Sequence, residues 1–242
     1  MSSIRRLVLV RHGESQWNQE GRFTGWADVD LTDVGVLQMH EAAAALKAAD
    51  ITFDVAFTSV LRRCIRSQWI LQDAMDCMWV PVIPDWRLNE RHYGGLTGQL
   101  RDDVIRIHGQ DMVNQWRRAY DAAPPPLVEL KDSLVQIDRR YHALQPEQIP
   151  SGESLHQTVR RVDGAWREVI APALRSHQQV LVMAHGNSLR ALIKIIEGLS
   201  DQDCQSLEVP NAAPLIYELD ETLTVQGKTE LTVQPRQSST IL

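Results

Sequence analysis

The sequence predicts an α/β fold, a three-layer sandwich in which helices flank a mostly parallel sheet. Two uninterrupted apolar runs, 7–10 and 180–184, are typical of strands that are buried on both faces of a sheet. Segments with apolar residues at helical spacing separate the candidate strands, and this alternation favours parallel strands joined by helices. Because ligands of such sheets bind beyond the carboxyl ends of the strands, we expect a site where these two runs end.

The first run extends back to residue 4, and three further segments are expected to form strands: 54–58, 79–82 and 215–219. Proline has no amide hydrogen to donate to a neighbouring strand, so Pro81 places its strand at an edge of the sheet.

Helices are expected where apolar residues recur three or four positions apart. Thr32, Ser59 and Ser154 can cap three of them, because their hydroxyls can accept a hydrogen bond from the first turn. The expected helical segments are 32–49, 59–76, 101–119, 154–176 and 187–198.

The chain is expected to form a single α/β domain over residues 1–219. Three prolines at 124–126 end a helix and begin an irregular excursion at about 122–150. Residues 220–242 form a polar tail, in which short alternating patterns permit weak strands or disorder.

Composition narrows the class of protein. The 242 residues carry a net charge of −6, which argues against nucleic-acid and anionic-membrane partners, since these need a basic surface. Cys64, Cys77 and Cys204 are odd in number and lack metal-ligand spacing, as in a reduced intracellular protein. The chain starts without an apolar leader and has no membrane-spanning run, so we expect a cytoplasmic protein.

Both apolar runs end in His-Gly. Arg11, His12 and Gly13 follow the first run, and His185 and Gly186 follow the second. An arginine beside a buried strand needs an anion to meet its charge, and glycine lets a ligand approach the backbone. A helix that starts behind His185 further favours negative charge. The sequence therefore predicts an anion site with two imidazoles.

Two histidines and a carboxylate can also form a zinc site. The arginines oppose this, because Arg11, Arg62 and Arg63 repel a cation and attract an anion, and Arg63 can grip phosphoryl oxygens with two hydrogen bonds. The chain lacks a Walker loop, a G-x-G-x-x-G motif and a His-Glu-x-x-His motif. A phosphate is the better ligand, and no metal is expected.

This arrangement suggests attack of an imidazole on phosphorus, with His12 as the candidate nucleophile. His185, as an imidazolium, can stabilise charge in the transition state, and Glu90 can supply the leaving group with a proton. A neighbouring bound anion would raise the pKa of Glu90, although a solvated loop carboxylate is the simpler interpretation of Glu90 alone. Arg117 and Arg118 can serve either a helix carboxyl end or an acidic group of the substrate.

Seven stretches match the motifs of one known protein family: 7–18, 22–26, 57–63, 88–94, 115–118, 152–155 and 184–192. With them the chain resembles the 2,3-bisphosphoglycerate-dependent phosphoglycerate mutases of the histidine phosphatase superfamily. Arg-His-Gly is typical of the whole superfamily, whereas Glu-Arg-His-Tyr-Gly together with Trp-Arg-Arg is typical of the mutases.

The resemblance implies interconversion of 3- and 2-phosphoglycerate in glycolysis and gluconeogenesis, with 2,3-bisphosphoglycerate as the donor that phosphorylates His12. It implies that His12 is the nucleophile, that Glu90 exchanges the proton and that His185 stabilises the transition state. The implied substrate-binding residues are Arg11, Ser15, Asn18, Thr24, Gly25, Arg63, Arg91, Tyr93, Arg101, Arg117, Arg118, Gly186 and Asn187. It also implies a homodimer or homotetramer and no metal. Bisphosphoglycerate-synthesising relatives tend to have glycine in place of Ser15.

Two features depart from the mutase pattern. Leu100 and Arg101 replace an Asn-Lys pair, and the tail 220–242 lacks the family's Tyr-Leu-Gly segment. A mutase must keep water away from its phosphohistidine, so a changed tail leaves open a phosphatase that releases phosphate from small phosphate esters. A third alternative is a non-catalytic protein that binds phosphorylated ligands.

Overall fold

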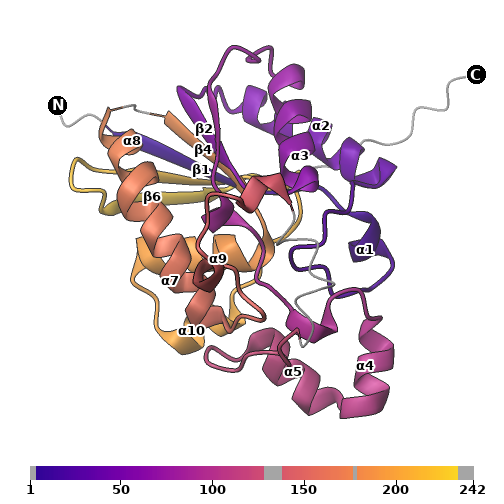
Figure 1. The fold of residues 1–242 in the computed structure, drawn as a ribbon. Coiled ribbons are helices and arrows are strands. Elements are labelled where there is room, and N and C mark those ends of the chain that lie inside the picture. Colours follow the sequence, from indigo (N-terminus) through magenta and orange to yellow (C-terminus); the bar gives the residue numbers. More distant parts are fainter. Residues whose placement is uncertain (1–3, 128–137, 177–178, 234–242) are drawn as a thin grey trace, which may run out of the picture.

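The computed structural model describes residues 4–127, 138–176 and 179–233. A six-stranded sheet with the order β3-β2-β4-β1-β5-β6 forms its centre (Figure 1). The strands are β1 (Arg5–Arg11), β2 (Val55–Thr58), β3 (Val82–Pro84), β4 (Gln179–Ala184), β5 (Leu215–Leu219) and β6 (Val225–Glu230). The first four run parallel, whereas β5 is antiparallel to β1 and β6 to β5. The predicted mostly parallel sheet is confirmed.

Helices cover both faces of the sheet, as predicted. One face is covered by α2 (Asp33–Ala48) and α3 (Arg62–Ala74), and the other by α7 (Leu155–Ala165), α8 (Ala171–Ser176) and α9 (Gly186–Glu197) (Figure 1). Alternate residues of β1 belong to two different apolar clusters: Leu7 and Leu9 to one, Val8 and Val10 to the other. All four side chains are almost fully buried. The central strands are therefore apolar throughout, as expected for a sheet with two covered faces.

The helix caps at Thr32 and Ser154 are confirmed, because each hydroxyl accepts a hydrogen bond from the third residue of its helix. The cap expected at Ser59 is wrong. Helix α3 begins at Arg62, and the Ser59 hydroxyl lies against Leu61 and a histidine instead. β3 is the predicted edge strand, but it begins at residue 82 rather than 79.

The single helix expected over 101–119 is wrong. Gly109 has a φ of 83°, which is left-handed backbone that glycine adopts readily, and the chain divides there into α4 (Arg101–His108) and α5 (Gln110–Arg118). A small apolar cluster of Phe23, Leu96, Val104 and Val113 holds these helices to the rest of the chain. The segment expected as one helix over 154–176 contains a π-helical turn between α7 and α8.

The excursion at about 122–150 includes residues 128–137, which lie outside the described residues. Short 3-10 helices occupy Arg139–Tyr141 and Pro146–Gln148. Within the segment expected as a polar tail, β6 pairs with β5 along the sheet edge. Residues 234–242 of that tail are not described.

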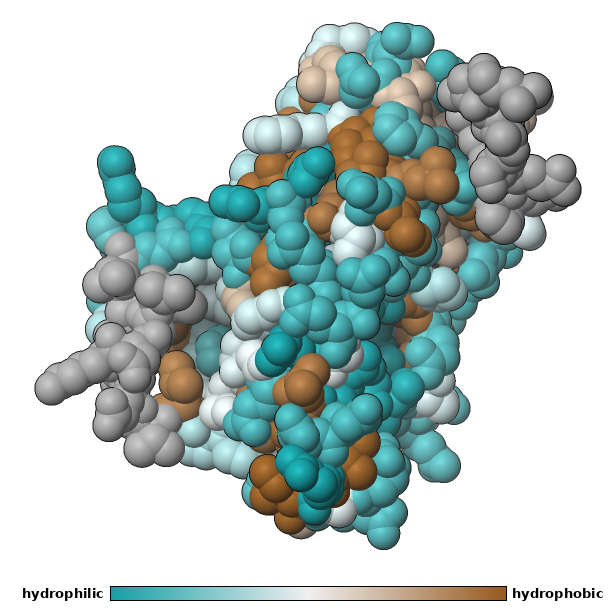
Figure 2. All heavy atoms as spheres, turned by 90° about the vertical axis from the view of Figure 1, so that its right-hand side faces the viewer, coloured by the Kyte–Doolittle hydropathy of each residue, from teal (hydrophilic) through white to brown (hydrophobic). Residues whose placement is uncertain are grey.

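Two short α-helices, α1 (Gln16–Gln19) and α10 (Asp201–Ser206), and two 3-10 helices, Trp86–Leu88 and Gly94–Leu96, complete the described structure. The face shown in Figure 2 is mainly hydrophilic, with an upper and a lower group of apolar residues. The lower group is at the same height as α4 and α5 in Figure 1. Ile107 and Met112 are exposed apolar residues of these two helices. No helix in the described ranges is long and apolar enough to cross a membrane.

Candidate active site

The two predicted histidines lie together at the carboxyl ends of β1 and β4. These strands are neighbours with Arg11 opposite Ala184, so His12 and His185 leave the sheet side by side. Their ring centroids are 4.9 Å apart in an edge-on arrangement. Both side chains are almost fully buried. The rim of two imidazoles expected from the His-Gly repeat is therefore present.

The hydrogen bond of His12 fixes which of its nitrogens can react. Its Nδ1 lies 2.6 Å from the carbonyl oxygen of Gly13. Because a carbonyl oxygen only accepts, Nδ1 carries the hydrogen and Nε2 of the neutral ring keeps its lone pair. Burial and the nearby charges of Arg63 and Arg11 lower the pKa of His12 well below its usual value. His12 is therefore held as a neutral base with an available Nε2.

Gly13 has a different role from the one expected. A Cβ at this position would lie 2.2 Å from the backbone oxygen of Gly35, so glycine is needed for the close approach of the strand end to α2. Its amide also donates to the Ser67 hydroxyl at 3.2 Å. The missing side chain thus serves packing of the loop that carries His12, rather than access of a ligand.

Two arginines flank the histidines. Arg63 donates to the carbonyl oxygens of Ala27 and Gly25, both at 2.8 Å, and Arg11 donates to the carbonyl oxygen of Val209 at 2.8 Å. Burial lowers the pKa of both guanidinium groups. The Nε of Arg11 is buried without a hydrogen-bond partner. Burial removes water from these cations, and the neutral carbonyls that hold them do not balance their charge. A bound anion would balance it, so this part of the site attracts anions.

His185 is enclosed by two small polar side chains. Its Nε2 lies 2.9 Å from the Ser59 hydroxyl and 3.3 Å from the Cys64 thiol. Burial and then the charge of Arg63 lower the pKa of His185 well below its usual value. Without an anion the ring is therefore neutral, and a negative charge beside it would favour the imidazolium.

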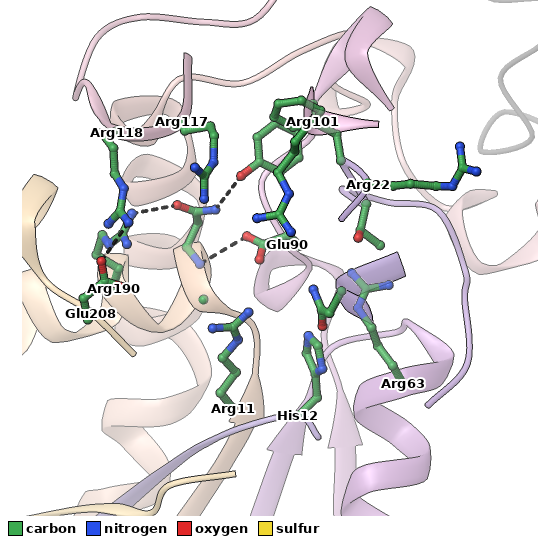
Figure 3. Close-up of a pocket in the computed structure, with 16 residues that line it drawn as sticks. Arg11, His12, Arg22, Arg63, Glu90, Arg101, Arg117, Arg118, Arg190 and Glu208 are labelled. Carbon is green, nitrogen blue, oxygen red and sulfur yellow. Dashed lines mark hydrogen bonds and ion pairs between the residues drawn. The ribbon is translucent and has the colours of Figure 1, made fainter. Parts of the chain in front are cut away.

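Glu90 lies between His12 and a second group of arginines (Figure 3). Its Oε1 accepts hydrogen bonds from the backbone amides of Arg91 at 2.8 Å and Asn187 at 3.1 Å. Both bonds hold the same oxygen, which leaves Oε2 for proton exchange with a ligand. A carboxyl group fixed in this way can act as a general acid or base.

A buried ion pair supports the loop that carries Glu90. Arg161 pairs with Glu153 at 2.7 Å and donates to the carbonyl oxygens of Arg87, Asn89 and Glu90 at 2.6–3.0 Å. Glu153 also accepts from the amide of His92 at 2.8 Å. The polar loop is therefore fixed by charge-assisted hydrogen bonds although it has little regular structure of its own.

The site is a cavity of about 150 Å³ with a strongly cationic lining. We call the part around Arg11, His12, Arg63 and His185 the histidine end, and the part around Arg22, Arg101, Arg117 and Arg118 the outer end. In Figure 3, Arg101, Arg117 and Arg118 lie on the far side of Glu90 from Arg11 and His12, and Arg22 lies to one side. Seven arginines and two glutamates line the cavity, so it suits a small ligand with more than one negative group.

The structure brings most of the predicted site residues to this cavity. Its lining includes the predicted residues Arg11, His12, Asn18, Thr24, Arg63, Glu90, Tyr93, Arg101, Arg117, Arg118, Gly186 and Asn187. His185 lies directly behind His12. Three predicted residues support the lining instead: Ser15 caps α1, Gly25 accepts from Arg63, and Arg91 donates to Tyr93 and to the carbonyl oxygen of Arg117.

Four lining residues were not predicted: Arg22, Phe23, Arg190 and Glu208. Arg22 and Phe23 stand within the stretch 22–26, so their motif was a usable signal. Arg190 of α9 likewise stands within the stretch 184–192, whereas Glu208 comes from the segment after α10 and no motif marks it. Arg161 was also missed, since its pairing with Glu153 becomes visible only when α7 packs beside the loop, although Glu153 stands within the stretch 152–155.

The described residues contain no group of three or more His, Cys, Asp or Glu side chains arranged to hold a metal ion. Around the histidine end the nearest charged groups are arginines.

Comparison with known proteins identifies the family. The profile of the histidine phosphatase superfamily (branch 1) matches residues 7–145 and 135–227, which is most of the chain. The chain belongs to this superfamily. Superfamily membership agrees with the paired histidines and arginines at the strand ends, and it makes phosphoryl chemistry at a histidine the general activity of the site.

Solved structures share the fold at low sequence identity. A mycobacterial glucosyl-3-phosphoglycerate phosphatase aligns with a TM-score of 0.68 and 22% identity, over 97% of this chain and 100% of the other. The alpha-ribazole phosphatase of Shigella flexneri gives 0.67 and 20%, over 95% and 96%. A protein described as mycobacterial hydrolase 2 gives 0.70 and 21%, over 99% and 94%. These likenesses establish the sandwich architecture.

Proposed function

We propose that this protein is a 2,3-bisphosphoglycerate-dependent phosphoglycerate mutase, which interconverts 3- and 2-phosphoglycerate through a phosphohistidine on His12. The observation that carries the proposal is the cavity with two cationic ends and Glu90 between them. A phosphoglycerate has a phosphate at one end and a carboxylate at the other, so each end of the cavity has an anionic partner. The mutase-like motifs at 88–94 and 115–118 supply Glu90 and the outer arginines.

In the proposed reaction, Nε2 of His12 attacks a phosphorus of 2,3-bisphosphoglycerate. The N–P bond forms as the P–O bond to the glycerate breaks, and Glu90 gives its proton to the departing oxygen. Arg11 and Arg63 hold the phosphoryl oxygens, and His185 as an imidazolium offsets their charge in the transition state. The monophosphoglycerate leaves, and the phosphoryl group then passes from His12 to the free 2-hydroxyl of a 3-phosphoglycerate, whose proton Glu90 takes as the N–P bond breaks. The 2,3-bisphosphoglycerate formed in this way returns its 3-phosphoryl group to His12, which leaves 2-phosphoglycerate.

The geometry of His12 supports this role. Its Nδ1 is committed to the Gly13 carbonyl and its ring is held neutral, which are the two conditions for attack by Nε2. The cavity volume of about 150 Å³ is below the usual range for drug-sized ligands, so it favours a three-carbon ligand over a larger one.

The second candidate is a phosphatase that uses the same His12 chemistry and passes the phosphoryl group to water. The solved structures named above favour it, since two of them are described as phosphatases, one of a phosphorylated glycerate derivative. Residues 225–230 also favour it, because they pair along the sheet edge as β6 and do not line the cavity. A phosphohistidine without a cover is open to hydrolysis.

A steady-state assay separates the two candidates. The protein is supplied with 3-phosphoglycerate and a trace of 2,3-bisphosphoglycerate, and both 2-phosphoglycerate and free phosphate are followed. The proposal expects 2-phosphoglycerate as the main product and dependence of its rate on the bisphosphoglycerate. Free phosphate as the main product would establish the phosphatase instead.

A further inference from the structure

The second glutamate of the cavity, Glu208, lies on a short segment that two site arginines hold in place. The carbonyl oxygen of Leu207 accepts from Nε of Arg190 at 2.9 Å. On the other side of Glu208, the carbonyl oxygen of Val209 accepts from Arg11 at 2.8 Å. The backbone on both sides of Glu208 is thus anchored to the cavity, and this fixes where its carboxylate can reach.

The carboxylate of Glu208 forms an ion pair with Arg118, one of the outer arginines, at 2.7 Å (Figure 3). The Glu208 side chain is 71% exposed, so the pair lies at the mouth of the cavity rather than in its interior. Arg118 therefore already has an anionic partner before any ligand binds. Burial lowers the pKa of Arg11, and the negative charge of Glu208 acts in the opposite direction.

A carboxylate in an anion-binding cavity opposes binding in proportion to the charge of the ligand. It competes with the ligand for Arg118, and it repels every further negative group at the outer end. A ligand with one carboxylate there can use Arg117 and Arg101, which line the same end, whereas Arg22 already pairs with Glu20. A second phosphate carries more charge and meets more repulsion.

We propose that Glu208 is a specificity-determining residue, whose carboxylate lowers the affinity of the outer end for bisphosphorylated ligands relative to monophosphorylated ones. The ion pair between Glu208 and Arg118, anchored by Arg190 and Arg11 on either side, is the observation that carries this. In a site that needs 2,3-bisphosphoglycerate only transiently, such a residue favours exchange of ligand. The inference rests on the proposed function for its class of ligand.

The test is direct binding, by calorimetry, of three phosphate esters that differ at the far end. They are glycerol 3-phosphate, 3-phosphoglycerate and 2,3-bisphosphoglycerate. All proteins carry His12→Asn, so that no phosphoryl group is transferred during the titration. Glu208→Gln is compared with Glu168→Gln, a matched control: Glu168 is 69% exposed and pairs with Arg87 at 2.6 Å, away from the cavity lining.

We expect Glu208→Gln to lower the Kd of 2,3-bisphosphoglycerate about five- to tenfold and that of 3-phosphoglycerate about two- to threefold, with glycerol 3-phosphate nearly unchanged. The differences should shrink as salt is added. Glu168→Gln should change none of the three. A uniform effect on all three ligands, weaker binding of the bisphosphate or equal behaviour of the two variants would overturn the inference.

The outcomes also separate this inference from the proposed function. If the enzyme proves to be a phosphatase, the charge-graded change in Kd is still expected, because binding does not depend on where the phosphoryl group goes. If the parent protein binds the three esters equally and Glu208→Gln leaves them equal, the inference fails although the mutase activity can stand. Failure of the parent to bind any of them contradicts both.

Discussion

The histidine end and the outer end of the cavity are both cationic, yet they are built differently. At the histidine end, Arg63 is 1% exposed and donates to two backbone carbonyls, and the histidines are fixed by Gly13 and Ser59. At the outer end, Arg117 and Arg118 are only half-buried and stand at the end of α5. The groups proposed to react are therefore fixed by buried hydrogen bonds, whereas the arginines proposed to select the ligand are more exposed and pair at the surface.

The histidine end should be the less tolerant of change, and His12 should show the largest effect. His12→Asn removes the only nucleophile that the account assigns, so we expect no acid-labile phosphoryl group on the protein and no turnover. The measurement is labelling with 32P-2,3-bisphosphoglycerate. His142→Asn, at an exposed histidine, should label normally. Acid-labile label on the His12→Asn protein would identify a different nucleophile.

Arg63 should show the next largest effect, both on the rate and on its pH dependence. Arg63→Met removes a donor to the phosphoryl group, which we expect to slow phosphoenzyme formation by about 10²–10³-fold. Arg63 lowers the pKa of His12, so its loss raises that pKa. Since neutral His12 is the reactive form, the acid limb of the rate profile should move to higher pH.

Arg63→Lys is the matched control for the pH shift. Lysine keeps the charge but not the two-pronged geometry, so the rate should fall by less than in Arg63→Met and the acid limb should stay near its original position. Identical pH profiles for the two variants would show that the charge of Arg63 does not set the protonation of His12.

The outer end should respond with weaker binding rather than lost chemistry. Arg117→Gln removes one charged partner of the ligand, and we expect KM for 3-phosphoglycerate to rise about tenfold with kcat changed less. Initial-rate kinetics give this split. Arg106→Gln, at an exposed arginine of α4, is the control. A lower kcat at an unchanged KM would place Arg117 in the chemical step and would remove the distinction between the two ends.

The loop that carries Glu90 and His92 should affect how the free energy of unfolding depends on pH. Burial lowers the pKa of His92 to about 4, so the unfolded chain takes up a proton there below pH 6.5 while the folded chain does not. The free energy of unfolding should therefore fall by about 3 kcal/mol from this group as pH drops from about 6.5 to about 4. Urea unfolding of the wild type and of His92→Asn measures it. The variant should lose less stability with acid, and equal losses would refute the assignment.

The sequence predicts the histidine end well because short motifs follow two strands that must lie in one sheet. Arg11 and Ala184 are partners in adjacent strands, so His12 and His185 meet as a direct consequence of the fold. The break at Gly109 was a missed local signal, since glycine is unfavourable inside a helix and common where a helix ends.

The outer end could be predicted only in part. Arg117, Arg118 and Arg190 lie in recognisable motifs, but Glu208 reaches the cavity because the segment after α10 returns to the end of β1. The hydrogen bond that places this segment joins Arg11 to Val209, 198 positions apart in the chain. Contacts of that separation follow from tertiary packing, and neither periodicity nor capping patterns contain them. The same holds for Arg161 beneath the Glu90 loop.

The fate of the phosphoryl group on His12 distinguishes the proposed mutase from a phosphatase. The protein is labelled with 32P-2,3-bisphosphoglycerate, freed from excess donor and mixed with 3-phosphoglycerate, and the released label is separated into phosphoglycerates and free phosphate. We predict rapid transfer of most of the label to phosphoglycerates, and slow release as phosphate when 3-phosphoglycerate is omitted. Rapid release as free phosphate, with or without 3-phosphoglycerate, would contradict the account.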